Sequence, residues 1–405
     1  MSKSLLYHGF GIPSSFEYKR TAFHKGKIQF TIQRYLYNCK CSICGSYNVK
    51  PRGIKTRTLR TVPIGKKIVE IIININRLEC LDCHTIRQEK IEFADSKRTY
   101  THAFERLVID LSQHMTIKDV ALYLKTSWDI VKDIQKRNLK KKFSRPNLKG
   151  LKYIAIDEIS VRKGHKYLTI VMDLLSGKIV YVGDGKGADS LQDFWKRLKR
   201  SKAYIEAVSI DMSPAYIEAV QTNLSHAAIV FDHFHVVKLF NDKLSQLRCK
   251  LHRELNDGLQ KDILKGTRWL LLKNPENLNN EKDEKQRLEE ALELNKPLAT
   301  AYYMKEDLRQ IWSQDNKENA KIFIKDWIKR ARASGIQILK KFANTLSAHA
   351  SGILAYYDHK ISTGPLEGMN NKIKTMKRQA YGFRDLEFFK LKIYALHQTK
   401  YALIG

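Results

Sequence analysis

Short apolar segments between residues 153 and 231 limit the fold of this chain more than any other feature of its sequence. Five of them have the length and β-branched composition of buried strands: 153–156, 167–172, 178–182, 207–211 and 228–231. The segment 190–200 has apolar residues at helical spacing and follows the third of these strands. Pro214 opens a further helix between the last two strands. The predicted order is therefore β-β-β-α-β-α-β.

This order indicates a ribonuclease H-like α/β core, in which an antiparallel meander is continued by crossover units into a mixed sheet. Asp157 ends the first strand, within the stretch KYIAIDEIS at 152–160, and Asp211 ends the fourth. These two strands are neighbours in such a sheet, so we expect their carboxylates to converge. Glu158 would point to the other side of a continued strand, and we give it a supporting role.

A third acid, Glu367, stands at the start of a basic helix. Three converging carboxylates repel one another, and two Mg²⁺ or Mn²⁺ ions about 4 Å apart would neutralise them and hold a scissile phosphate. Lys374 follows two helical turns later and Arg378 one turn beyond, where both would contact DNA phosphates. The alternative for Glu367 is an ordinary helix-start acid favoured by the macrodipole.

The segment Asp232-His233-Phe234-His235 is a further polar cluster. Its Asp232 follows a strand, and its His-x-His pattern is compatible with a transition-metal site. We favour the alternative, in which Asp232 and His235 are neighbours of the catalytic acids and help to orient them without binding the metal.

The cysteines predict a metal site near the N-terminus. Of six cysteines, five lie between residues 39 and 83, a clustering that suggests metal binding rather than disulfides. Two CxxC pairs flanking a strand at 68–73 predict a structural zinc ribbon with four ligands: Cys41, Cys44, Cys80 and Cys83. Unmetallated thiols, Cys39 in place of Cys41, and His84 in place of Cys83 are the alternatives. The sixth, Cys249, is expected to be a buried, inert thiol.

Residues 116–139 have the pattern of a helix-turn-helix. A short helix at 116–124 is followed by a turn at 125–127 and a second helix from Trp128, with Thr116 and Ser127 as the expected N-caps. An ordinary helical hairpin is the alternative, but the basic surroundings favour DNA. The residues expected to contact DNA on this helix and on the hairpin at 162–166 are Lys132, Lys136, Arg137, Lys140, Arg162, Lys163 and His165.

The charge balance points to a polyanionic partner. The chain has 405 residues, and its 73 basic and 42 acidic side chains give a net charge of +31. Nucleic acid is the favoured partner, and an anionic membrane surface is the rival. No apolar run approaches the roughly 18 residues of a membrane span, and no signal-peptide core follows the first residues. We expect a cytoplasmic protein that does not act at a membrane.

The chain is expected to have several domains, because residues 236–360 are almost entirely helical in pattern. The predicted boundaries are 1–95 for an N-terminal region with the zinc ribbon, 96–146 for the helix-turn-helix, 150–236 for the first part of the core, 237–360 for a helical insertion, and 361–405 for completion of the core.

Several blocks of the sequence resemble the ISL-three family of bacterial insertion-sequence transposases. They are IAIDEISVRKGHKYLTIVMDL, SIDMSPAY, VFDHFHVVKL, RWLLLK and the segment that begins STGPLEGMNNKIK. The resemblance implies a DDE-type transposase whose metal-binding acids are Asp157, Asp211 and Glu367, with the helical segment interrupting the core. In this family an Asn-Gly pair often precedes the glutamate, where this chain has Ser362-Thr363-Gly364.

The expected function is that of a DNA transposase. It would bind the terminal inverted repeats of its element as a homo-oligomer, a dimer or larger, then cut the ends and join them to target double-stranded DNA by two-metal-ion phosphoryl transfer. Because it binds DNA, we expect it to associate with the bacterial nucleoid. The alternatives are a catalytically silent or domesticated DNA-binding regulator and a ribonuclease H-like nuclease that cuts without joining.

Overall fold

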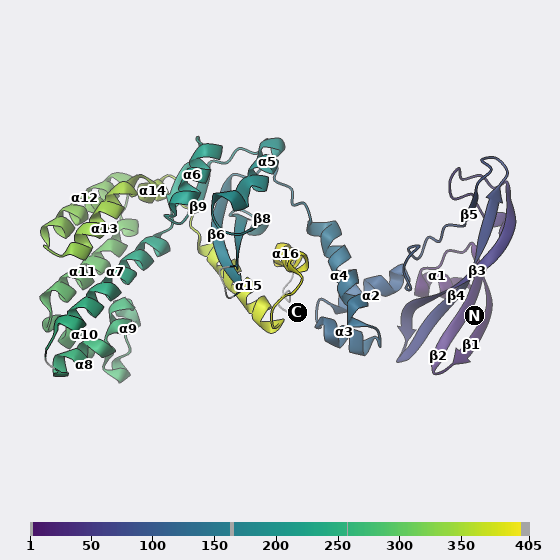
Figure 1. Ribbon diagram of the computed structural model, residues 1–405, viewed down its shortest axis with the longest axis horizontal. Coiled ribbons are helices and arrows are strands. Elements are labelled where there is room, and N and C mark those ends of the chain that lie inside the picture. Colours follow the sequence, from purple (N-terminus) through teal and green to yellow (C-terminus); the bar gives the residue numbers. More distant parts are fainter. Residues whose placement is uncertain (1–2, 163–165, 257, 398–405) are drawn as a thin grey trace. The chain divides into compact units, whose positions relative to one another are not determined.

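The computed structural model describes residues 3–162, 166–256 and 258–397, and the chain divides into two compact units (Figure 1). Residues 1–144 and 375–405 form the first unit, and residues 145–374 form the second. The segment predicted at 361–405 as one domain is therefore shared between the units. Lys163 and His165 lie outside the described residues, and Arg162 is described only as the last residue of a strand.

The first unit contains a twisted sheet next to a short helix, α1 (Lys3–Phe10). Its strands are β1 (Phe16–His24), β2 (Lys27–Arg34), β3 (Val49–Ile64), β4 (Lys67–Cys80) and β5 (Ile86–Gln88). They are ordered β1-β2-β4-β3, with β5 also paired to β4. The alternating apolar residues of β4, from Val69 to Ile75, are buried, as the period of two along a strand requires.

A group of three helices follows the sheet: α2 (His102–Leu111), α3 (Ile117–Tyr123) and α4 (Trp128–Phe143). The hydroxyl of Thr116 accepts the amide of Asp119, and that of Ser127 accepts the amide of Ile130, which confirms both predicted N-caps. The apolar residues predicted to pack between the helices are buried or packed against the buried cluster: Val120, Ala121, Leu124, Ile130, Val131 and Ile134.

The C-terminal helix α16 (Leu386–Ala395) packs against α4 within the same unit. Asp385 caps α16 by accepting the amide of Phe388 at 3.0 Å, and its carboxylate also contacts Lys132 at 3.2 Å and Lys136 at 3.0 Å. Glu387 contacts Lys136 at 2.7 Å and Lys140 at 3.0 Å. These lysines hold the pKa of Asp385 near 2, although its partial burial acts in the opposite direction.

The sheet of the second unit confirms the predicted order of elements. Its strands are β6 (Tyr153–Arg162), β7 (Lys166–Asp173), β8 (Lys178–Asp184), β9 (Ala207–Ile210) and β10 (Ala228–Phe231), in the order β10-β9-β6-β7-β8. The strands β6, β7 and β8 are antiparallel, and β9 and β10 continue the sheet in parallel to β6. The connecting helices are α5 (Gln192–Ser201) and α6 (Pro214–Asn223).

One strand end differs from the prediction. Asp157 does not end β6, because the antiparallel pairing with β7 continues past it, from Asp157 opposite Ile170 to Arg162 opposite Lys166. The apolar run ends at Ile156, but the hydrogen bonds of the hairpin carry the strand onward. Asp157 and Glu158 therefore point to opposite faces of a continuous strand.

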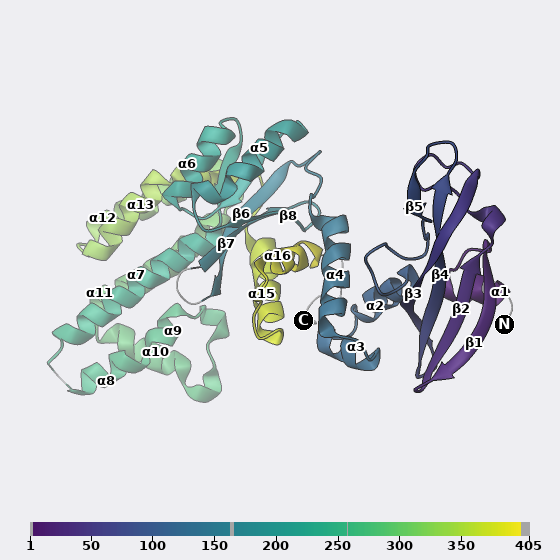
Figure 2. The same cartoon turned by 45° about the vertical axis from the view of Figure 1, so that its right-hand side comes forward.

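Between β10 and the last helix of this unit the chain is almost entirely helical, as predicted (Figure 2). The helices are α7 (His233–Glu254), α8 (Gly258–Gly266), α9 (Arg268–Leu272), α10 (Glu284–Glu293), α11 (Lys296–Arg309), α12 (Lys317–Ala333), α13 (Gln337–Ala348), α14 (Ala350–Leu354) and α15 (Gly364–Gln379). This segment also contains short 3-10 turns at Pro275–Asn277, Asn280–Lys282, Gln310–Ser313 and Ala355–Tyr357. Two further 3-10 turns, at Leu36–Asn38 and Ala188–Leu191, lie earlier in the chain. No helix in the described part of the chain is both long and apolar enough to cross a membrane.

The helical segment packs around an aromatic cluster and returns to the sheet at a glycine. The rings of Phe240, Trp327 and Phe342 pack edge to face at 4.8–5.8 Å. Where α14 meets β10, a Cβ on Gly352 would lie 2.5 Å from two ring carbons of Phe231. Only glycine allows this close approach of helix and strand.

A buried lysine fixes the end of α9. Lys305 is 1% exposed, and its ammonium donates to the carbonyls of Leu271 at 2.8 Å and Lys273 at 3.1 Å. It also contacts the carboxylate of Glu306 at 2.6 Å. Because the last carbonyls of a helix have no partner within the helix, this ammonium replaces the missing donors.

We expect Lys305→Met to lower the free energy of unfolding by about 2–4 kcal/mol, because it leaves buried carbonyls and a carboxylate without their donor. Urea unfolding followed by circular dichroism would measure the change. Lys296→Met, at an exposed position of the same helix, is the control and should change stability by less than about 0.5 kcal/mol. Equal effects of the two substitutions would contradict the capping role.

We expect Asp385→Ala to loosen α16, because it removes a helix cap together with two ion pairs. Amide hydrogens of α16 should exchange roughly tenfold faster, which corresponds to about 1.4 kcal/mol of local opening. Exchange measured by mass spectrometry on the whole chain would report it. Glu387→Gln, at a side chain 52% exposed, should change the exchange far less.

Candidate active site

Three aspartates lie at one level of the second sheet. The β6–β9 register pairs Ala155 with Ser209, and the β9–β10 register pairs Ile210 with Phe231. When the first register is continued by two residues, Asp157 lies opposite Asp211. When the second is continued by one residue, Asp211 lies opposite Asp232. Residues in register on neighbouring strands point to the same face, so the three carboxylates belong to one edge of the sheet.

Asp157 is held in place by two hydrogen bonds. Its Oδ1 accepts the amide of Glu158 at 2.7 Å, and its Oδ2 accepts Nδ2 of Asn370 on α15 at 2.7 Å. Burial raises the pKa of Asp157, and the charge of Asp211 raises it further. The charge of His235 and the two hydrogen bonds act in the opposite direction. A carboxylate held among other acids in this way favours the approach of a cation.

The carboxylate of Glu367 on α15 also belongs to this cluster, because His235 lies between it and Asp232. His235 Nδ1 lies 3.6 Å from Asp232 Oδ2, and its Nε2 lies 3.8 Å from Glu367 Oε1. Although burial would lower it, the pKa of His235 is raised by Asp232 and by the charges of Asp157 and Asp211. Burial and the charges of Asp232 and Asp157 raise the pKa of Glu367, while the charge of His235 acts against them.

Asp232 is the most buried acid of the site. It is 2% exposed, and its other oxygen lies 3.5 Å from His233 Nδ1. Burial disfavours its charge, but the nearby imidazoles of His233 and His235 hold the pKa of Asp232 below its usual range. Thr363 is buried, and its hydroxyl makes no hydrogen bond to another described residue.

The polar atoms of this site fit a bound cation. Each of Asp232, His235 and Glu367 offers a ligand atom within 4.8 Å of the others. Both oxygens of Asp232 and Oδ1 of Asn370 are buried without a hydrogen-bond partner among the described residues. Carboxylate oxygens left unsatisfied in a buried site are the donors that Mg²⁺ and Mn²⁺ prefer.

Glu158 lies on the other face of β6, among hydroxyl groups. The Tyr216 hydroxyl on α6 donates to Glu158 Oε2 at 3.5 Å and lies 3.1 Å from that of Thr169. Burial raises the pKa of Glu158, as does the charge of Asp211, while Lys186 lowers it. Its position agrees with a supporting role, which stays a prediction.

The four cysteines of the two CxxC pairs form a compact cluster in the first unit. The Sγ atoms of Cys41 and Cys83 are 3.6 Å apart, those of Cys44 and Cys80 are 3.5 Å apart, and all four lie within 4.8 Å. The backbone amides of Cys44 and Ile43 lower the pKa of Cys41 to about 6. Thiolate ligands of one tetrahedral Zn²⁺ are about 3.8 Å apart, so the spacing fits this ion.

Cys39 is not part of this cluster. Its Sγ lies 3.8 Å from Glu89 Oε2 and 3.6 Å from Asn76 Nδ2, and burial raises its pKa to about 11. His84 is likewise outside the group of four. The expectation for Cys249 was wrong, because this thiol is exposed on α7.

Comparisons with known proteins agree with this architecture. Residues 154–393 match a family model described as "Transposase", of the ISL3 type, and residues 89–137 match one described as "Helix-turn-helix domain of transposase family ISL3". The chain belongs to transposase family ISL3.

Among relatives of this ISL3 chain is the transposase for insertion sequence element IS1001 of Bordetella parapertussis. It is 33% identical over 88% of this chain and 88% of its own length. The transposase for insertion sequence element IS1557 of Mycobacterium tuberculosis is 28% identical over 85% of this chain and 82% of its own. A solved Drosophila P element transposase strand transfer complex has a TM-score of 0.34 at 12% identity, covering 62% of this chain and 78% of that chain.

The predicted DNA-contacting cations of this ISL3 chain have different surroundings. Lys132, Lys136 and Lys140 are paired with Asp385 or Glu387, and Arg137 contacts Asp133 and Glu105. By contrast, Lys374 and Arg378 of α15 are exposed and make no ion pair with a described residue. A role of each in DNA binding stays a prediction.

Asp232 was predicted to support the catalytic acids, and it directly follows β10, the strand beside β9; its role stays a prediction. Sequence reasoning missed Asn370, whose side-chain amide donates to Asp157 at 2.7 Å. Asn370 lies three residues after Glu367, on the same face of one helix. That spacing was the signal that could have identified it.

Proposed function

We propose that this chain is a DDE-type DNA transposase that cuts and joins the ends of its insertion sequence in a metal-dependent reaction. The observation that carries the proposal is the row of Asp157, Asp211 and Asp232 at one sheet edge, with Glu367 brought to it by α15. Such a concentration of acids, of which Asp232 is buried and the others are half-buried, is costly unless cations bind there.

The fold supports the proposal. The strand order β10-β9-β6-β7-β8, with three antiparallel strands followed by two parallel ones, is compatible with the proposed ribonuclease H-like core. The helical segment between β10 and α15 would then be an insertion into this core. It separates Asp232 from Glu367 in sequence, while the His235 imidazole lies between their carboxylates.

Asp157, Asp211 and Glu367 would hold Mg²⁺ or Mn²⁺, with Asp232 and His235 beside them. Bound there, such ions neutralise the acids, polarise a phosphodiester and lower the pKa of water. Asn370 keeps the Asp157 carboxylate in one orientation through its 2.7 Å hydrogen bond. The His235 imidazole lies between the carboxylates of Asp232 and Glu367, and its protonated form would offset their repulsion.

The remaining parts fit the recognition of DNA ends. The helix-turn-helix and the net charge of +31 support binding to the terminal inverted repeats and then to target DNA. The cysteine cluster would hold a structural Zn²⁺, since four protein ligands leave no open position. Bringing two ends together calls for a dimer or larger assembly.

We expect Asp211→Ala to abolish Mg²⁺-dependent cleavage of the element's ends, with a loss of at least about a thousandfold, while end binding changes little. Cleavage and strand transfer would be assayed on a duplex that carries the inverted repeat expected beside the gene. Asp193→Ala, which removes an acid 78% exposed on α5, is the matched control.

Three outcomes would contradict the proposal. Substantial cleavage by Asp211→Ala would show that Asp211 is not one of the catalytic acids. Binding without cleavage by the unaltered protein would indicate a DNA-binding regulator. Cleavage without joined products would indicate a nuclease.

We expect removal of zinc to unfold the cysteine loops while the second unit stays folded. A strong chelator should release about one zinc ion per chain and make Cys41, Cys44, Cys80 and Cys83 reactive to a maleimide. Mass-spectrometric mapping would follow each thiol, with Cys249 as the internal control that is reactive before and after. A metal content of zero in freshly purified protein, with all four thiols already reactive, would refute the zinc assignment.

A further inference from the structure

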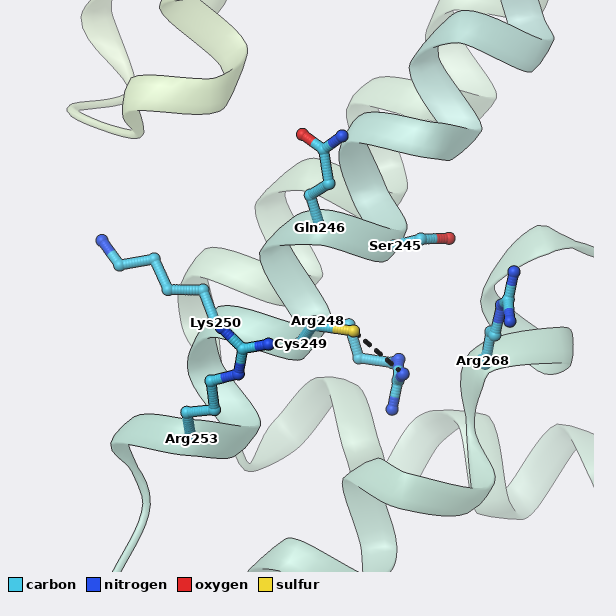
Figure 3. A pocket seen from close by; sticks show the side chains of 7 residues that line it. All are labelled: Ser245, Gln246, Arg248, Cys249, Lys250, Arg253 and Arg268. Carbon is cyan, nitrogen blue, oxygen red and sulfur yellow. Dashed lines mark hydrogen bonds between the residues drawn. The ribbon is translucent and has the colours of Figure 1, made fainter.

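An open, basic pocket lies between α7 and α9, within the helical segment of the second unit. Its volume is about 430 Å³, and Figure 3 shows the side chains that line it. Lys250 and Arg253 project on one side, Arg268 reaches in from α9 on the other, and Arg248 lies between them. The sequence prediction assigned this surface no role.

The pocket has four cationic side chains and no acidic one among its lining residues. Lys250 approaches Glu254 only at 3.7 Å, and both side chains are more than half exposed, so water screens the pair. Arg253 and Arg268 make no ion pair with any described residue. The Arg268 guanidinium instead lies 5.0 Å from the centre of the Trp269 ring, a cation–π contact that orients it.

Arg248 is fixed in the floor of the pocket. Its Nη1 donates to the carbonyl of Leu264 at 2.9 Å, and its Nη2 lies 3.3 Å from the Sγ of Cys249. Its Nε is buried and has no hydrogen-bond partner among the described residues. A guanidinium held in this way, beside three unneutralised cations, is an anion-binding arrangement because little freedom is lost when the anion binds.

The distance from the acid cluster matches a DNA substrate. His235 and Arg248 belong to the same continuous helix, α7, so they are separated by about 20 Å along its axis. That distance corresponds to about six base pairs of duplex DNA. A duplex that begins at the acids and runs along α7 would have phosphates at the level of the pocket over that length.

We propose that this pocket binds the phosphodiester backbone of duplex DNA on the flank of the cleavage site. The inference rests on the proposed function, since it takes the substrate at the acid cluster to be DNA. Because the contacts are to phosphates, binding there is independent of base sequence. The pocket therefore adds affinity without selecting the element's ends.

The first test compares two double variants of equal charge loss. Arg253→Gln with Arg268→Gln should weaken binding to a random-sequence duplex roughly tenfold or more and reduce the slope of log K against log salt by about 2. Lys325→Gln with Lys329→Gln, at exposed positions of α12, should leave the slope unchanged. Equal losses in both variants, or an unchanged slope in the pocket variant, would overturn the proposal.

The second test uses the unaltered protein, so it does not depend on how a variant folds. Cys249 is exposed in the pocket, and its alkylation rate by N-ethylmaleimide should fall at least fivefold when duplex DNA is bound. Inorganic phosphate at the same phosphate concentration should not protect it. Protection by phosphate alone would reassign the pocket to a small anion and overturn the proposal.

The same samples separate failure of this inference from failure of the proposed function. If fluorescence anisotropy shows the duplex bound while Cys249 stays fully reactive, the pocket does not contact DNA and the transposase proposal stands. If neither the random duplex nor a duplex with the inverted repeat binds, both proposals fail.

Discussion

Repulsion among acids gathered at one end of the strands is the constraint on which the second unit depends. Asp232 is buried and Asp157 is half-buried, and the register of β6, β9 and β10 holds both in the same part of the sheet. The chain offsets part of that repulsion with its own residues. The start of α7 provides the imidazoles of His233 and His235, and α15 provides the amide of Asn370. A site that remains this acidic after such compensation is built for cations.

Helix caps and short apolar segments in the sequence made much of the architecture predictable. The caps Thr116 and Ser127 and the order of strands and helices from β6 to β10 follow from signals within a few residues, and the structure bears them out. The extent of β6 was missed, because hydrogen bonding to β7 continues beyond the apolar run. The exposure of Cys249 was missed as well, since a helical pattern alone does not say which face is covered.

Contacts between distant segments account for what the sequence could not predict of the sites. Lys132 and Lys136 look free in a basic stretch, but Asp385, some 250 residues later in the chain, pairs with both. The importance of Asp232 depends on β10 lying beside β9, which only the folded sheet establishes. In contrast, the cysteine cluster was predictable because each CxxC pair positions its own two thiols.

The close approach of Gly352 to Phe231 limits how the chain can vary in length. Phe231 immediately precedes Asp232, so a side chain at position 352 would displace the strand that carries a buried acid of the site. Among the described residues, the main packing partners of the outer helices α8 to α10 are other helices of the same helical segment. Insertions and deletions among relatives should therefore accumulate in those outer helices, while the residues that return the chain to β10 keep their spacing to Glu367.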